Sequence, residues 1–190
     1  MKSGILRNML IYGLGALFLK GISFFLIPLY TRMLLPQDYG NLELLNTFTS
    51  ILEIICSLGL FNFLYMDFFH KDAEGKKQLI NSLLSVYLVL SSLLFVITAI
   101  LLWFFHASIL GSLPLYLIYF GVLTTYLGFF QAIYILVLKL TERAKTVSLL
   151  QVSVGLIVMS LNIWFVYYLQ IGIAGIIWAN LISMLISLLI

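Results

Sequence analysis

Residues 5–30 read ILRNMLIYGLGALFLKGISFFLIPLY, an apolar run long enough to cross a lipid bilayer as one helix. Lys20 lies near the middle of this run. A charge at that depth in hydrocarbon is costly, so it needs either a partner or a function. Residues 31–40 follow as TRMLLPQDYG, which we expect to be a short polar loop. The run decides the class of protein, and its lysine is the first candidate site residue.

The whole chain has the composition of a membrane protein. Of its 190 residues, 63% are hydrophobic and 9% are charged, whereas soluble domains carry about a quarter charged residues. Continuous apolar runs recur along the sequence, which predicts an all-α integral membrane fold. We expect six transmembrane helices, at about 5–30, 42–66, 79–104, 114–138, 146–168 and 171–190.

The basic residues predict the orientation of these helices. Of the ten Lys and Arg residues, eight fall near the N-terminus or in the connections after the second and fourth runs. Arg32 falls on the other side and Lys20 within the membrane. By the positive-inside rule the N-terminus is cytoplasmic, in the plasma membrane. The aromatic residues then expected at the outer interface are Trp103, Tyr116, Trp164, Tyr167 and Tyr168.

Small and polar residues recur at helical spacing along five of the runs, which places them on one face of each helix. The sets are Gly13, Ala16, Lys20 and Ser23; Asn46, Ser50, Glu53 and Ser57; Ser85 and Ser92; Thr124, Gly128 and Gln131; and Ser148, Gln151, Gly155 and Asn162. Small residues alone indicate close helix packing, whereas amides and charges in a membrane require partners or water. The candidate cavity residues are therefore Lys20, Asn46, Glu53, Gln131 and Asn162.

The last run carries a different pattern. Its small residues recur every four positions, at Gly175, Ala179, Ser183 and Ser187. Such a small-xxx-small seam is typical of helix–helix packing. We therefore predict a packing face there, with no contact to a substrate.

Lys20 and Glu53 stand at nearly the same depth in neighbouring runs. They lie about 10 and about 11 residues from the outer ends of their helices, or roughly 15 Å and 16 Å at 1.5 Å per residue. We therefore predict a Lys20–Glu53 pair. Two roles stay open for it. The pair fixes the register of two helices, or Lys20 is a cavity cation whose availability to an anionic ligand is set by Glu53.

Motifs of soluble chemistry are missing from the sequence. It contains no GxxxxGK[ST] phosphate loop, no HExxH and no GxSxG. The single Cys56 cannot form an intramolecular disulfide, and His70 and His106 have no metal-ligand spacing. We therefore expect no metal, no cofactor and no enzymatic activity. The basic loops follow from membrane topology, so we expect no nucleic-acid partner either.

Two stretches resemble the N-terminal part of polysaccharide-export flippases. These are TRMLLPQDYGNLELLN at 31–46 and SLGLFNFLYMDFFHKDAEGKKQLINS at 57–82. The resemblance is to the Wzx-like branch of the superfamily that also holds MATE antiporters and MurJ lipid II flippases. Its most specific element is a turn formed by Arg32, Pro36, Asp38, Tyr39 and Gly40.

The resemblance implies one six-helix lobe of a two-lobe transporter that works by alternating access. The implied substrate is a polyprenyl-pyrophosphate-linked oligosaccharide, moved from the inner to the outer leaflet for surface polysaccharide assembly. Lys20 would contact the anionic pyrophosphate, as cationic residues of the first helices do in this family. The implied partners are membrane lipids, the lipid-linked substrate and the polysaccharide polymerase machinery.

The sequence departs from the family at two places. Met66 and Asp67 stand where many relatives carry an arginine, so a second basic contact is not carried over. The sequence also ends at Ile190, inside the last apolar run. Because related transporters bind their substrates between repeats, we expect a C-terminal lobe beyond Ile190 or a second copy of the chain.

Two other functions remain open. A cation-coupled multidrug antiporter of the MATE type would have a similar topology, but it predicts a carboxylate in the first helix, where this chain has Lys20. A membrane-embedded enzyme of glycan assembly predicts large outer loops or interfacial clusters of His, Asp and Arg. The outer loops of this sequence are short and almost uncharged.

Overall fold

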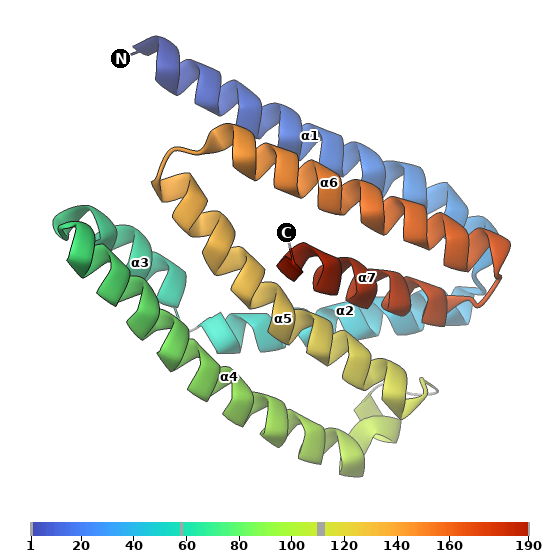
Figure 1. Ribbon diagram of the computed structural model, residues 1–190. Helices are drawn as coiled ribbons and strands as arrows, with labels where there is room; N and C mark the ends of the chain where they lie inside the picture. The colour runs from blue at the N-terminus through green and yellow to red at the C-terminus, as the bar shows by residue number, and fades with distance from the viewer. Residues whose placement is uncertain (1, 58, 110–112, 190) are drawn as a thin grey trace. The chain divides into compact units, whose positions relative to one another are not determined.

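The computed structural model describes residues 2–57, 59–109 and 113–189, with the backbone alone at 2–6 and 105–109, and it is helical apart from short connections (Figure 1). Its elements are α1 (Lys2–Met33), α2 (Pro36–Ser57), α3 (Leu60–Asp67), the 3-10 helix η1 (Phe68–His70), α4 (Ala73–Ile109), α5 (Leu115–Leu140), α6 (Ala144–Asn162), the π-helix η2 (Ile163–Tyr168) and α7 (Ile173–Leu189). The chain divides into two compact units. The first is Met1–Glu43 with Val137–Ile190, and the second is Leu44–Leu136.

The helices make the chain a multi-pass membrane protein. Within the described residues, four helical stretches are long and apolar enough to cross a bilayer, namely Arg7–Met33, Ala73–Phe104, Leu115–Leu140 and Ala144–Tyr168. The predicted continuous span at 42–66 is instead the bent pair of α2 and α3, whose axes differ by 43°. With this pair the described chain has up to five spans, where six were predicted. The sixth run forms α7, an apolar helix of 17 residues.

Gly59 explains why the span predicted at 42–66 is broken. It directly precedes α3 with φ at 75°, in the left-handed region. Glycine adopts this conformation without the steric penalty of a Cβ, so it ends a helix where other residues would continue it. The run of apolar side chains passes through the break unchanged, which is why hydropathy predicted one straight span.

Contacts between α1 and α6 show that the two helices run parallel (Figure 1). Ser148 donates to the Ile11 carbonyl at 2.9 Å near the start of both helices, and Tyr30 donates to Asn162 at 2.9 Å near their ends. In a bilayer, two parallel helices are separated by an odd number of crossings. Helices α4 and α5 supply two of these, so the parity favours α2 and α3 together as one bent crossing.

The loop predicted at 31–40 is confined to Leu34 and Leu35, and the rest of the family-marker stretch is helical. Arg32 lies in the last turn of α1, and α2 already begins at Pro36. The fixed φ of proline suits the first position of a helix, and its ring pushes the preceding residue out of the helical conformation. Asp38 lies in the first turn of α2, where the helix dipole stabilises a carboxylate, and Tyr39 and Gly40 continue the helix.

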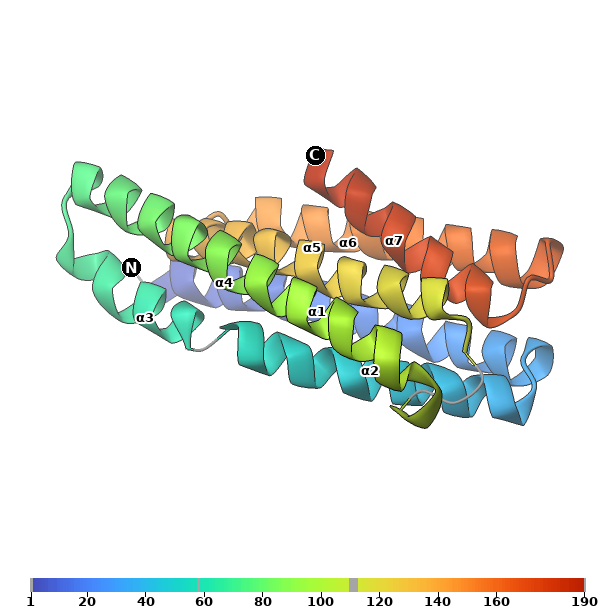
Figure 2. The ribbon, with the colours of Figure 1, turned by 90° about the horizontal axis from the view of Figure 1, so that it is seen from below.

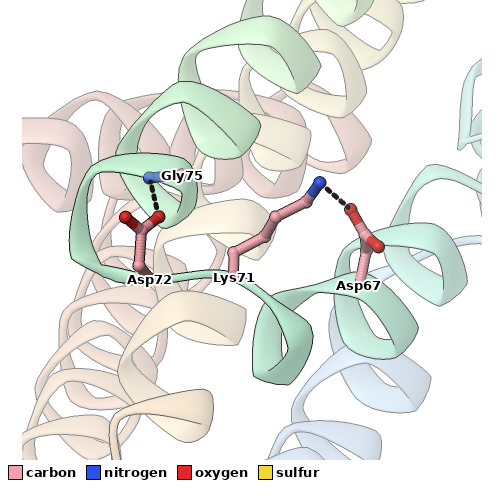
Figure 3. A network of polar contacts seen from close by, with 4 residues as sticks. All are labelled: Asp67, Lys71, Asp72 and Gly75. Carbon is pink, nitrogen blue, oxygen red and sulfur yellow. Dashed lines mark hydrogen bonds and ion pairs between the residues drawn. The ribbon is translucent and has the colours of Figure 1, made fainter.

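The basic connection between the second and third runs is also shorter than predicted (Figure 3). Helix α4 begins at Ala73 because Asp72 caps it. The Asp72 carboxylate accepts from the Gly75 N–H at 2.9 Å. The backbone carbonyl of Asp72 accepts from the Lys76 N–H at 2.9 Å. Lys71 and Asp67 form an ion pair at 3.7 Å one helical turn apart. Lys76 and Lys77 therefore lie in the first turns of α4.

Helix α7 packs against α6 and η2 (Figures 1 and 2). The four small residues that recur along it are all buried, namely Gly175, Ala179, Ser183 and Ser187. A Cβ at Gly175 would come within 2.9 Å of the Phe165 Cβ and 3.2 Å of its carbonyl carbon. The glycine therefore lets α7 approach the backbone of η2.

Gly155 has the same role between α6 and α1, and this allows a direct test. A Cβ at Gly155 would lie 2.6 Å from Leu19 Cδ2 and 3.1 Å from Ile22 Cδ1. We expect Gly155→Leu to lower the free energy of unfolding by about 1–3 kcal/mol, because it overpacks this contact. Thermal unfolding in detergent measures the change.

The matched control is Gly13→Leu, in the middle of α1. A Cβ at Gly13 would meet nothing within 4 Å, so we expect its melting temperature to stay close to that of the unmodified protein. Equal losses in the two variants would mean that leucine disturbs any glycine of these helices, and that Gly155 has no special place in the contact.

Candidate functional site

Lys20 lies on the face of α1 that is turned away from α6. The residues of α1 that are buried in the first unit are Gly15, Ile22 and Leu26. The predicted polar stripe of this helix, in contrast, is exposed along its whole length, at Gly13, Ala16, Lys20 and Ser23. Lys20 is engaged in no hydrogen bond or ion pair among the described residues of its unit. The stripe is therefore an open polar face within a membrane-length helix.

Small and polar residues of the fifth run, in contrast, lie against α1. Ser148, Gly155 and Asn162 all contact α1. Asn162 is 0% exposed, its Oδ1 accepts from the Tyr30 hydroxyl at 2.9 Å and its amide donates to the Val158 carbonyl at 2.8 Å. Both ends of the amide are satisfied, so the structure brings Asn162 together with Tyr30 inside a helix–helix contact.

A small cavity lies inside the second unit, between α2, α4 and α5. The cavity has a volume of about 20 Å³, measured as the space open to the centre of a water molecule. It can hold about one water. Its polar lining is formed by Glu53, Cys56, Tyr87, Ser91, Thr98, Thr125 and Tyr126. Glu53 is itself exposed, so it lies at the edge of the cavity, whereas Tyr87, Ser91 and Thr98 are buried.

Two rings of an aromatic stack, those of Tyr87 and Phe129, line this cavity. The ring centroids of Tyr87 and Phe129 lie 3.6 Å apart, with an interplanar angle of 5°. Phe61 stacks on Phe129 with a distance of 4.6 Å between the ring centroids. The Tyr87 hydroxyl donates to the Tyr126 carbonyl at 3.0 Å. The three rings come from α3, α4 and α5, so the stack ties the short helix α3 to the rest of the unit.

Several of these residues were not identified from the sequence. The sequence pattern favoured Ser85 and Ser92 in the third run, but both are exposed. The buried face of α4 carries Ser91 and Thr98, which are also seven residues apart. Tyr87, four residues before Ser91, was the available signal, because a tyrosine in an apolar run needs an acceptor for its hydroxyl. Tyr30 carried the same signal.

The remaining candidates are placed one by one. Asn46 is exposed on α2, on the same helix as Glu53. Gln131 is half-buried on α5 and has an interaction partner. Lys20 belongs to the first unit and Glu53 to the second, so the Lys20–Glu53 pair stays a prediction, and so does the two-lobe arrangement.

The comparisons with known proteins give one match. A family model described as polysaccharide biosynthesis protein matches residues 5–190 of the chain. No curated protein and no solved structure matches it. The matched range includes the open face of α1, the cavity of the second unit and the buried seam of α7.

Proposed function

Because the chain belongs to the polysaccharide biosynthesis protein family, we propose that it is a flippase for a lipid-linked saccharide. In this proposal it moves a polyprenyl-pyrophosphate-linked oligosaccharide from the inner to the outer leaflet of the plasma membrane. The protein has a cytoplasmic N-terminus, transports its substrate without chemical change and contributes to surface polysaccharide assembly. The observation that carries the proposal is Lys20 on the open face of α1.

The energetics of Lys20 favour an anionic ligand. A charged side chain in the middle of a membrane helix costs roughly 2.5–3.5 kcal/mol if it faces lipid. Lys20 is turned away from α6 and is exposed, so its face of α1 needs water, an opposite charge or an anion. A pyrophosphate offers several charged oxygens, and charge-assisted hydrogen bonds to them are strengthened where the dielectric constant is low. A lysine at mid-depth therefore suits the crossing of a phosphorylated lipid head.

The open polar faces also suit alternating access. The face of α1 with Lys20 and the face of α2 with Asn46, Ser50 and Glu53 are each exposed in their own unit. We propose that each lines a hydrated transport path. A second lobe or a second copy of the chain would then close that path, as repeats do in related secondary transporters.

Reconstitution tests this function directly. The intact gene product would be placed in liposomes that contain a polyprenyl-pyrophosphate oligosaccharide with a fluorescent sugar. A membrane-impermeant quencher then reports the fraction of label in the outer leaflet. We expect the protein to accelerate the exchange of label between leaflets, and exchange equal to that of protein-free liposomes would contradict the proposal.

The same liposomes separate the two other functions. A MATE-type antiporter would expel a cationic dye under an ion gradient without moving the labelled lipid. Glu53 at the cavity edge is the feature that would serve such coupling, but α1 carries a lysine where an antiporter of this type would have a carboxylate. An enzyme of glycan assembly would change the mass of the labelled saccharide, which mass spectrometry detects.

A further inference from the structure

The first unit contains a cleft at the end where α1 and α6 both begin. Its volume is about 280 Å³. The lining residues come from α1, from the connection between α5 and α6, and from the first turn of α6, namely Arg7, Asn8, Ile11 and residues 142–146. We propose that this cleft binds the phosphate group of an anionic phospholipid. The site is separate from the proposed transport path and does not depend on that function.

The charge of the cleft is positive. It is lined by the basic side chains of Arg7, Arg143 and Lys145 and by one carboxylate, that of Glu142. All three basic side chains are exposed, and among the described residues none of them forms an ion pair or a side-chain hydrogen bond. Three cations against one carboxylate leave the cleft with a net positive charge, which favours an external anion.

The backbone at the start of α6 adds donors to the same cleft. Glu142 has a φ of 58°, and the chain turns there from α5 into α6. The Arg143 carbonyl accepts the first helical bond, from the Val147 N–H at 3.1 Å. The N–H groups of residues 144–146 therefore have no acceptor within the helix. Free N–H groups together with the positive end of the helix dipole attract phosphates.

Membrane topology alone explains basic residues on this side of the bilayer, but it does not explain this arrangement. The other basic cluster that we assign to the same side has internal partners. Lys71 pairs with Asp67 at 3.7 Å, and the Lys76 ammonium lies 4.9 Å above the Phe68 ring. In the cleft, by contrast, three cations without an ion pair line a hollow. This difference supplies a matched control.

Apolar side chains next to the cleft favour a lipid as the source of the phosphate. Leu10 and Leu14 follow Arg7 by three and seven residues along α1, and Leu149 follows Lys145 by four along α6. This spacing keeps them on the same faces as the basic residues, and all three leucines are exposed. A phospholipid can therefore place its phosphate in the cleft while its acyl chains lie along these leucines.

The test compares two triple variants in nanodiscs of phosphatidylcholine with a minor fraction of phosphatidylglycerol. One variant is Arg7→Gln/Arg143→Gln/Lys145→Gln, and the control is Lys71→Gln/Lys76→Gln/Lys77→Gln. After transfer to an uncharged detergent, native mass spectrometry measures the phosphatidylglycerol retained per protein. We expect the affinity of the cleft variant for phosphatidylglycerol to fall roughly 100-fold, and its retention to fall accordingly, since each of the three basic residues adds about fivefold in affinity at a membrane surface. The control should lose clearly less, because Lys71 and Lys76 already have partners within the protein.

Two further arms decide the outcome. Glu142→Gln removes the one carboxylate of the lining, so it should raise retention of phosphatidylglycerol, and it decides the question if the triple cleft variant does not fold. Excess inorganic phosphate should leave retention unchanged. Equal losses in both triple variants, no rise for Glu142→Gln, or displacement of the lipid by inorganic phosphate would each overturn the proposal.

Discussion

Replacing Lys20 by alanine is expected to reduce the export of surface polysaccharide strongly while leaving the protein folded in the membrane. Lys20 is exposed and has no hydrogen bond or ion pair with the described residues of its unit, so the substitution removes no contact that holds the unit together. In the proposed function it removes a charge-assisted contact to the substrate, worth about 1.5–3 kcal/mol. Transport should fall roughly 10- to 100-fold, measured as surface polysaccharide in cells that carry the intact gene.

Three controls make this result specific. Lys20→Arg keeps the positive charge and should retain most of the export. Lys139→Ala removes an exposed lysine at the end of α5 and should have little effect. The double exchange Lys20→Glu/Glu53→Lys separates the two roles left open for Lys20, because restored transport would favour a simple ion pair. Normal export by a stably inserted Lys20→Ala protein would remove Lys20 from the mechanism.

Replacing Phe129 by alanine should cause the largest loss of stability in the second unit. Phe129 is 3% exposed, and it stacks with Tyr87 at 3.6 Å and with Phe61 at 4.6 Å. The variant loses both ring contacts and leaves a void between three helices. We expect the free energy of unfolding to fall by about 3–5 kcal/mol, which thermal unfolding in detergent measures.

The matched control for this loss is Phe104→Ala in α4, where the side chain is 72% exposed. Its melting temperature should change little, because the lost side chain contacts lipid or detergent. Phe129→Leu keeps an apolar side chain without the ring and should cost less than about 1.5 kcal/mol. If Phe129→Ala and Phe104→Ala lost the same stability, the aromatic stack would not be the element that holds α3 to the unit.

Apolar length explains why the helical class and the approximate helix positions could be predicted. The fifth predicted run, 146–168, agrees closely with α6 and η2 together, at 144–168. The errors occur where a single residue acts through backbone geometry. Pro36 begins a helix inside a stretch that has the composition of a loop, and Gly59 breaks a run that has the composition of one helix. Hydropathy is averaged over a window of residues, so it does not detect the effect of one proline or one glycine on the backbone.

The candidate site was predictable only where a charge marks it. Lys20 and Glu53 stood out because an ionised group in an apolar run is costly. Tyr30 and Tyr87 did not, because a tyrosine contributes mostly apolar surface and its hydroxyl finds an acceptor only once the helices are packed. The basic residues of the cleft were visible in the sequence, but their convergence from α1 and α6 depends on a contact between segments more than a hundred residues apart.

The hydrogen bond between Tyr30 and Asn162 joins residues that are 132 positions apart, and this separation has a consequence for biogenesis. At a synthesis rate of about 5–20 residues per second, roughly 7–26 s pass between the appearance of the two residues. During that interval α1 is in the bilayer without α6, so the Tyr30 hydroxyl and the Leu19 and Ile22 surface have no partner from that helix. A ribosome stalled before residue 144 would leave α1 without α6, with this polar and apolar surface of α1 not covered by that helix.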